Sequence, residues 1–155
     1  MSDTDIKIMR LALEHAERAR KNNNTPVAAI IANKDMILGI GENEVRSNGD
    51  CTAHAEVIAL RNVCKNHGVD ALHGASCYTT MEPCPMCCWA LVEGGIDRIV
   101  LGARHHQLGR KEYGLYSLER LLDLTGRKLA ITTGILSDEC ESLRREWMRA
   151  TGRES

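Results

Sequence analysis

The sequence predicts an α/β fold in which a mixed β-sheet carries helices on both faces. Apolar residues recur at helical spacing near the start of the chain, and short apolar runs alternate with amphipathic segments through its second half. The chain has 155 residues, a length at which one domain buries about two-thirds of its surface. We therefore expect residues 1–155 to form a single domain.

The first part of the chain is expected to contain a helix and a hairpin. Residues 3–21 carry apolar side chains at helical spacing, Ile6 and Met9 among them, and a polar residue before them can cap the helix. Two apolar runs follow, 27–32 and 36–40. A short polar turn separates them, which is typical of an antiparallel hairpin.

A loop and a second helix should come next. The stretch 42–51 is rich in Asn, Ser, Gly and Asp, the composition of a loop. Thr52 can then cap a helix over residues 53–66. We expect its inward-facing residues to be Val57, Ile58, Leu60 and Val63.

The second half alternates strands with helices. Strands are expected over residues 75–80, 96–102 and 128–133. Helices are expected over residues 84–93, over 117–125, and from 137 onward with Ser137 as the cap. A polar loop over residues 103–113 interrupts this order. The alternation predicts a mixed sheet covered by helices.

Charge and cysteine content exclude several classes of protein. Twenty basic and 21 acidic residues give a net charge of −1, so no overall positive field attracts nucleic acid or a membrane. No apolar run is long enough to span a membrane and the opening MSDTDIK does not resemble a secretory signal, so we expect a cytoplasmic protein. The seven cysteines suggest reduced thiols and metal binding. Four of them are expected to be small buried side chains: Cys51, Cys64, Cys77 and Cys140.

Two short motifs predict a catalytic zinc site. Cys84 and Cys87 are spaced to share one face of the first turn of a helix, where both sulfurs can reach one ion. A helix N-terminus also favours the thiolate. His54 begins another expected helix, so the three residues would hold one Zn²⁺ ion per chain between two helix N-termini. Three protein ligands leave one coordination position for water.

Glu56 is the expected catalytic residue. It lies two positions from His54 and can share that first turn without binding the metal. Its carboxylate could take a proton from the water and return it to a leaving group. This chemistry suits a poor leaving group such as an amine.

The two motifs resemble those of the cytidine deaminase superfamily. DCTAHAE at 50–56 and TMEPCPMC at 80–87 are similar to the signature H-x-E…P-C-x-x-C, in particular to the branch of guanine, cytosine and tRNA adenosine deaminases. The resemblance runs from about residue 6 to 147. It implies a three-layer α/β/α sandwich around a five-stranded mixed sheet, and a homodimer.

The resemblance also implies a reaction and its residues. An activated water attacks the amine-bearing carbon of an aromatic base, Glu56 protonates a ring nitrogen and then the amino group, and ammonia leaves. Asn43 matches the family asparagine that hydrogen-bonds the base or its sugar. The backbone amide of Ala55 would hold a carbonyl or ring atom.

Other interpretations of these residues stay open. The metal site could be closed and structural, with Cys88 or Cys77 as a fourth ligand. Trp89 and Trp147 could contact the substrate, but large side chains on amphipathic helices usually belong to the core. The basic segment 104–111 could be a solvated loop or could contact substrate or phosphate.

We expect the substrate to be a free amino-bearing nucleobase or nucleoside of the guanine, cytosine or guanosine type, as in purine and pyrimidine salvage. The alternative is the wobble adenosine of a tRNA, flipped into the pocket. The Gly- and Ser-rich run of the tRNA enzymes is absent after Gly102, and the net charge is slightly negative, which favours the small molecule. A third interpretation is a catalytically silent zinc-binding domain, against which Glu56 argues.

Overall fold

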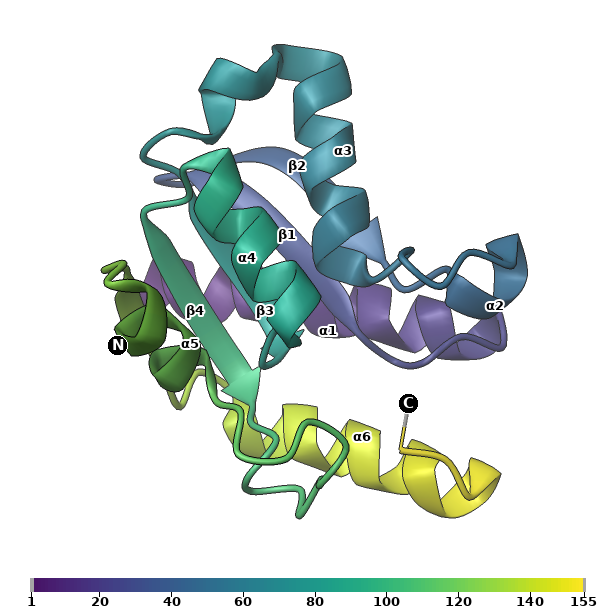
Figure 1. The fold of residues 1–155 in the computed structure, drawn as a ribbon. Coiled ribbons are helices and arrows are strands. Elements are labelled where there is room, and N and C mark those ends of the chain that lie inside the picture. The colour runs from purple at the N-terminus through teal and green to yellow at the C-terminus, as the bar shows by residue number, and fades with distance from the viewer. Residues whose placement is uncertain (1, 155) are drawn as a thin grey trace.

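The computed structural model describes residues 2–154, which form a five-stranded mixed sheet between two layers of helices (Figure 1). The strands are β1 (Ala28–Asn33), β2 (Met36–Glu42), β3 (Ser76–Met81), β4 (Arg98–Ala103) and β5 (Ala130–Thr132), in the order β2-β1-β3-β4-β5. Strand β1 is antiparallel to β2 and β3, whereas β3, β4 and β5 are parallel. The predicted α/β/α sandwich is confirmed.

The helices are α1 (Asp3–Lys21), α2 (Val45–Asn48), α3 (Ala55–His67), α4 (Pro85–Gly94), α5 (Leu118–Thr125) and α6 (Ser137–Thr151), with a 3-10 turn, η1, at Val69–Leu72. Helices α1 and α6 pack on one face of the sheet. On the opposite face α3 lies beside α4, and α5 contacts α4 (Figure 1). No helix within residues 2–154 is both long and apolar enough to cross a membrane.

The expected loop and second helix differ from the structure in two ways. A short helix, α2, lies inside the segment expected to be a loop. The following helix begins at Ala55, with His54 as its N-cap. Thr52 does not cap it, because both its backbone N–H and its hydroxyl donate to the Asp50 carboxylate, at 2.9 and 2.7 Å. This turn delays the helix by two residues and leaves His54 at its tip.

The buried side of α3 also differs from the expected one. Ala55, Ala59, Leu60 and Val63 are buried on its inner side, whereas Val57 and Ile58 are only partly covered. The prediction that these last two residues face inward was therefore wrong. Ser137 is likewise the first residue of α6 and not its cap, because Leu136 holds the cap position with a left-handed φ of 50°.

Two glycines of β2 allow α3 to lie directly on the sheet. A Cβ atom at Gly41 would lie 2.1 Å from the carbonyl oxygen of Ala55, and one at Gly39 would lie 2.7 Å from the side chain of Val63. Only residues without a side chain fit there. The first turn of α3 therefore rests on the backbone of β2.

Two of the four cysteines expected to be buried are not. Cys51 and Cys64 are exposed, because Cys51 lies in the turn before α3 and Cys64 lies on its outer face. Cys77 and Cys140 are buried, as predicted.

A buried ion pair joins α1 to the sheet. Asp5 is 4% exposed and accepts two hydrogen bonds from Arg98 on β4, at 2.7 and 3.0 Å, and one from the hydroxyl of Tyr78 on β3, at 2.9 Å. Hydrogen bonding to Arg98 lowers the pKa of Asp5 against the opposing effect of burial. The first turn of α1 is thus bound to two neighbouring strands.

Candidate active site and metal centre

Three predicted metal ligands meet between the N-termini of α3 and α4. His54 caps α3, Cys84 caps α4 and Cys87 lies in the first turn of α4. Their donor atoms all lie within 4.8 Å of one another. One imidazole and two thiols form a ligand set that suits zinc. Within residues 2–154 neither Cys77 nor Cys88 belongs to this group, so three ligands leave the fourth position open.

The two cysteines shift each other's pKa in opposite directions. The Sγ atom of Cys84 accepts a hydrogen bond from the backbone N–H of Cys87 at 3.4 Å and lies 3.5 Å from Nδ1 of His54. The Cys87 thiol, followed by His54, lowers the pKa of Cys84 to about 4 although burial opposes it. The same contact raises the pKa of Cys87. Cys84 is therefore the more acidic of the two thiols, and a metal binds both as thiolates.

Glu56 lies beside the three ligands but is not one of them. It is 3% exposed and lines the same cavity, and the hydroxyl of Thr79 on β3 lies 3.1 Å from its carboxylate. Burial, followed by the charge of Cys84, raises the pKa of Glu56. A buried carboxyl with a raised pKa can both accept and return a proton near neutral pH.

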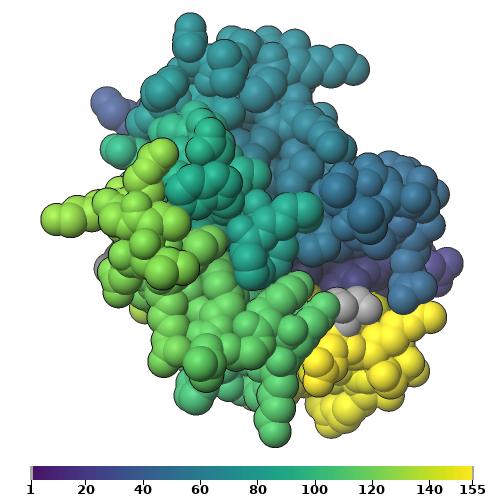
Figure 2. Space-filling view, in the orientation of Figure 1, coloured from purple at the N-terminus to yellow at the C-terminus, as the bar shows by residue number. Residues whose placement is uncertain are grey.

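A cavity of about 170 Å³ opens next to these residues. Its lining includes residues of α2, of the loop over residues 104–117 and of α6, and Figure 2 shows this face of the molecule, with α2 in blue and the loop in green. Apolar walls are contributed by Val27, Val45 and Met81, and polar ones by Thr25 and Asn43. This volume suits a single heterocyclic base.

Asn43 and Ala55 both line this cavity. The side-chain oxygen of Asn43 accepts a hydrogen bond from the backbone N–H of Val45 at 3.2 Å, which leaves the amide nitrogen as a donor. Ala55 is the first residue of α3, where the backbone N–H has no partner inside the helix. Both residues therefore offer N–H donors, as a base-binding role requires.

Trp89 and Trp147 lie away from the cavity lining. Trp89 is partly buried against the main core, with Arg127 5.5 Å from its ring. Trp147 is buried on α6, where it lines a separate surface hollow with Arg20 and Lys21 of α1. Contact of either ring with a substrate stays a prediction.

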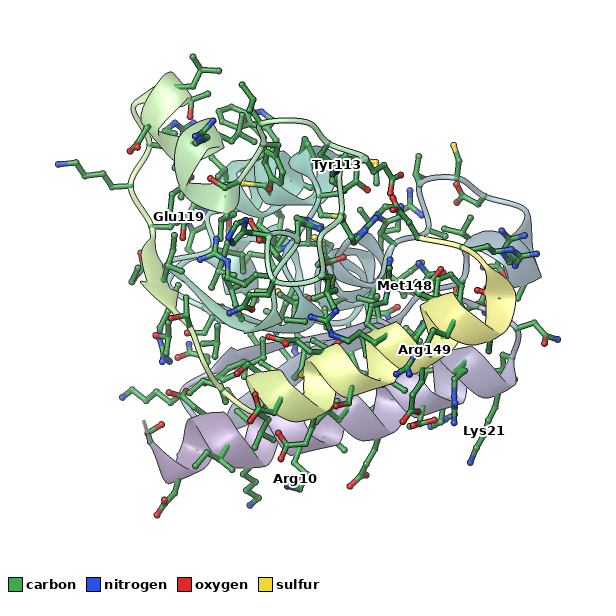
Figure 3. The ribbon with its side chains drawn as sticks, turned by 90° about the horizontal axis from the view of Figure 1, so that it is seen from below. Arg10, Lys21, Tyr113, Glu119, Met148 and Arg149 are labelled. Carbon is green, nitrogen blue, oxygen red and sulfur yellow. The ribbon has the colours of Figure 1, made fainter. Side chains whose placement is uncertain are left out.

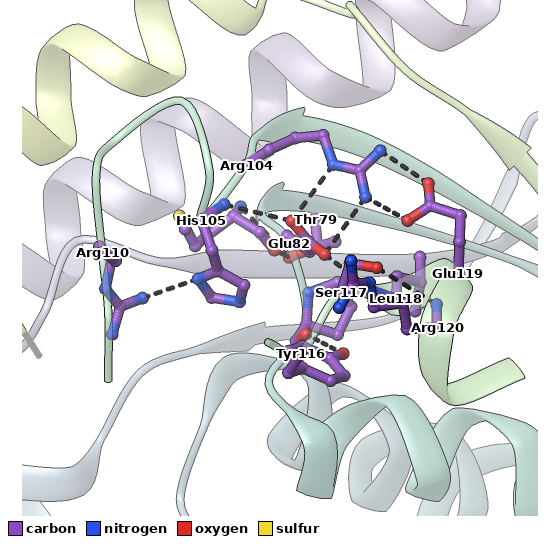
Figure 4. A network of polar contacts seen from close by, with 12 residues as sticks. Thr79, Glu82, Arg104, His105, Arg110, Tyr116, Ser117, Leu118, Glu119 and Arg120 are labelled. Carbon is purple, nitrogen blue, oxygen red and sulfur yellow. Dashed lines mark hydrogen bonds and ion pairs between the residues drawn. The ribbon is translucent and has the colours of Figure 1, made fainter. Parts of the chain in front are cut away.

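Glu82 was not singled out from the sequence, yet it organises the loop over 104–117 (Figure 4). It is 3% exposed and accepts hydrogen bonds from the Arg104 guanidinium at 3.2 Å, from the backbone N–H of His105 at 3.1 Å and from that of Leu118 at 2.8 Å. One buried carboxylate thus holds both ends of the loop. The Glu-Pro turn before Cys84 was the available signal.

The basic segment 104–111 divides between two roles. Arg104 is structural, since it pairs with Glu82 and Glu119. His105 and Arg110 instead line the cavity. The segment is therefore not simply a solvated loop, and its contact with substrate or phosphate stays a prediction.

Two further cavity residues, Tyr113 and Arg144, were missed. Arg144 comes from α6, one turn after Cys140 and one turn before Trp147, and so shares their buried stripe. A charged residue within an apolar helical stripe was the signal that could have identified it.

Comparison with known proteins adds a family match. The model of the cytidine and deoxycytidylate deaminase zinc-binding region matches residues 2–103. A tRNA-specific adenosine deaminase from Buchnera aphidicola subsp. Schizaphis graminum is 36% identical over 143 residues, which is 92% of each chain.

Two solved structures are similar in fold. A structure from a study of A-to-I editing by tRNA:A34 deaminases at the wobble position of transfer RNA is 28% identical, has a TM-score of 0.76 and covers 87% of this chain and 96% of its own. Guanine deaminase from Nitrosomonas europaea is 25% identical, also with a TM-score of 0.76, and covers 90% of this chain and 81% of its own.

Proposed function

The chain belongs to the cytidine and deoxycytidylate deaminase zinc-binding family, and from this membership we propose that it converts the wobble adenosine of a tRNA to inosine by hydrolytic deamination. One observation carries the choice of substrate. Two tRNA-specific adenosine deaminases are each 36% identical to this chain, and for one of them the similar region covers 92% of both chains. This substrate replaces the free nucleobase as the preferred one.

Local charge answers the objection that the net charge is slightly negative. Arg46, Arg110 and Arg144 all line the cavity. RNA is attracted by the positive groups near its binding site, and a balanced total does not remove that local field. A net charge of −1 is therefore compatible with a polyanionic substrate.

The reaction divides its work among a few residues. His54, Cys84 and Cys87 would hold the zinc, which would supply an activated water as the nucleophile. Glu56 takes a proton from that water and delivers it to the ring nitrogen. It then takes the second proton from the oxygen that has added to the ring and gives it to the amino group. Water and adenosine are consumed, and inosine and ammonia are released.

The remaining cavity residues position the base. Val27, Val45 and Met81 give apolar surface against which a flat ring can pack. The Asn43 amide nitrogen and the Ala55 backbone N–H supply donors for the base or its sugar. A flipped base bound in this way presents its amine-bearing carbon to the metal site.

A free nucleobase or nucleoside is the second candidate. The observation that favours it lies at the C-terminal end, where the carbonyl oxygen of Glu154 accepts a hydrogen bond from Arg144. This contact brings the last described residues against a wall residue of the cavity. A polymer needs more open space there than a single base does.

The experiment compares the two substrate classes. Zinc-loaded protein is incubated with an anticodon stem-loop bearing adenosine at the wobble position, and separately with guanine, cytosine, adenine and their nucleosides. We expect inosine and ammonia from the stem-loop only. Ammonia from a free base without inosine in the stem-loop would establish the second candidate instead.

Two variants accompany this assay. Glu56→Gln should bind zinc normally and lose at least about a hundredfold in kcat, because the proton shuttle is removed. The matched control is Glu93→Gln, an exposed residue at the end of α4, which should behave as wild type. Wild-type turnover in Glu56→Gln would contradict the mechanism for either substrate.

A further inference from the structure

Two arginines are buried in the wall of the cavity beside the metal site. Arg144 on α6 is 3% exposed, and the side chain of Arg110, from the loop over 104–117, is also 3% exposed. Both residues line the cavity. Burying a guanidinium is costly unless an anion or several acceptors compensate for the lost water.

The internal partners of Arg144 do not compensate its charge. Its guanidinium donates to the carbonyl oxygen of Glu154 and lies 5.3 Å from the centre of the Trp147 ring. No carboxylate among residues 2–154 forms an ion pair with it. Its Nε atom is buried and has no hydrogen-bond acceptor in the described part of the chain.

Arg110 is better paired but also has an unused donor. It forms an ion pair with Glu112, donates to Nδ1 of His105 at 3.1 Å and lies 5.4 Å from the centre of the Tyr113 ring. Its Nε atom, like that of Arg144, is buried without an acceptor. The cavity wall therefore contains two buried N–H donors on cationic groups that have no acceptor among residues 2–154.

The two charges also oppose each other. Burial, followed by the nearby charge of Arg110, lowers the pKa of Arg144 to about 9. The Arg144 guanidinium therefore remains protonated at neutral pH. Because the two positive charges repel each other inside one cavity, an anion that binds to both would stabilise them.

We propose that Arg110 and Arg144 form an anion subsite that binds a phosphate of the nucleotide whose base enters the cavity. A guanidinium fork matches phosphate oxygens and can donate two parallel hydrogen bonds. The inference rests on the proposed function in one respect: the phosphate is then a phosphodiester next to the flipped adenosine. The 5′-phosphate of a free nucleotide has the same chemistry.

Binding of inorganic phosphate tests the subsite without requiring turnover. Calorimetry on zinc-loaded protein should give saturable phosphate binding that Arg144→Met and Arg110→Met each weaken about ten- to a hundredfold, the loss expected from one charge-assisted hydrogen bond. Arg144→Lys should recover part of it. Phosphate that does not bind, or that binds all variants equally, overturns the proposal.

The matched control is Arg10→Met. Arg10 lies on the outer side of α1 (Figure 3), more than half exposed, and its loss changes the net charge by the same amount. It should bind phosphate as wild type does. The melting temperature and zinc content of every variant show whether it is folded. If Arg144→Met does not fold, Arg110→Met tests the proposal in its place.

Kinetic and binding measurements distinguish the two sources of phosphate. If a phosphodiester occupies the subsite, Arg144→Met raises KM for the stem-loop at least about tenfold with little change in kcat. If a 5′-phosphate does, AMP binds the wild type more tightly than adenosine and the variant loses that preference. Arginine-dependent phosphate binding without deamination of the stem-loop would reject the proposed function and retain the subsite.

Discussion

The hydroxyl of Thr79 lies 3.1 Å from the carboxylate of Glu56 and 2.7 Å from the carbonyl oxygen of Met81. A hydroxyl has one proton to donate. Thr79 can donate it to an ionised Glu56, or donate to Met81 while its oxygen accepts the proton of a neutral Glu56. The same residue thus accommodates both states of the proposed proton shuttle.

Replacing Thr79 should slow catalysis without weakening binding. Thr79→Val keeps the shape of the side chain and removes the hydroxyl, and we expect kcat to fall about ten- to a hundredfold with KM unchanged. The control is Thr80→Val, which removes a hydroxyl hydrogen-bonded to Ala28 on the other side of β3. It should cost about 1 kcal/mol of stability and leave kcat intact. Unchanged kcat in Thr79→Val would remove this residue from the mechanism.

Zinc content should depend on Cys84 and not on Cys88. We expect one zinc per chain by mass spectrometry, and loss of most of it in Cys84→Ser, because the remaining two ligands hold zinc weakly. The melting temperature should fall with the metal, since a ligand that binds only the folded state stabilises it. Cys88→Ser is the control, because Cys88 lies outside the ligand group. Equal zinc loss in both variants would point to a different ligand set.

Glu82→Gln should destabilise the protein and release the loop over 104–117. The substitution turns a buried acceptor into a group with its own donor, facing Arg104 and two backbone N–H groups. Breaking such a buried network costs about 3–5 kcal/mol. Urea unfolding gives the free energy, and amide exchange reports on the loop.

Glu119→Gln is the comparison for that change. Glu119 pairs with the same Arg104 from a side chain that is 44% exposed, and an exposed pair contributes about 1 kcal/mol or less. If both variants lost equal stability, Glu82 would not be the residue that holds the loop.

Acid should weaken the anchor of α1. Arg98 lowers the pKa of Asp5 in the folded protein below its usual 3.8. The ionised carboxyl therefore stabilises the folded state fully at pH values above the pKa that Asp5 has in the unfolded chain. The contribution is lost as pH falls through the lowered value. The free energy of unfolding of Asp5→Asn should therefore be about 2 kcal/mol lower than that of wild type at neutral pH, and this difference should shrink below about pH 4.

Asp3→Asn provides the reference for this pH dependence. Asp3 lies in the same first turn of α1 and is exposed. Because Asp3→Asn retains the Asp5–Arg98 pair, its free energy of unfolding should still fall in acid as that of wild type does. A constant difference between Asp5→Asn and wild type down to pH of about 2 would show that the charge of Asp5 is not what stabilises the fold.

Local patterns were sufficient to predict that three metal-binding side chains come together, and to predict most helices. The spacing of His54, Cys84 and Cys87 reflects the geometry of two helix N-termini, which neighbouring residues determine. Helix α1 matched its expected bounds because its caps and periodicity lie within it.

Long-range contacts were not visible in the same way. Glu82 and Arg144 act through partners distant in sequence or through a cavity that exists only after folding. The start of α3 was misplaced because the side chain of Asp50 competes for Thr52. Such competition between a turn and a cap depends on side-chain conformation, which periodicity does not report.

The absence of a side chain at Gly41 matters for redesign of the enzyme. Helix α3 carries a metal ligand at its tip and Glu56 in its first turn, and it rests on the backbone of β2 at that glycine. Any larger residue there would displace both groups together from the cysteines on α4. Libraries that alter the cavity can begin with Val45, which is only partly buried in its wall, whereas position 41 must stay glycine because α3 packs directly on its backbone.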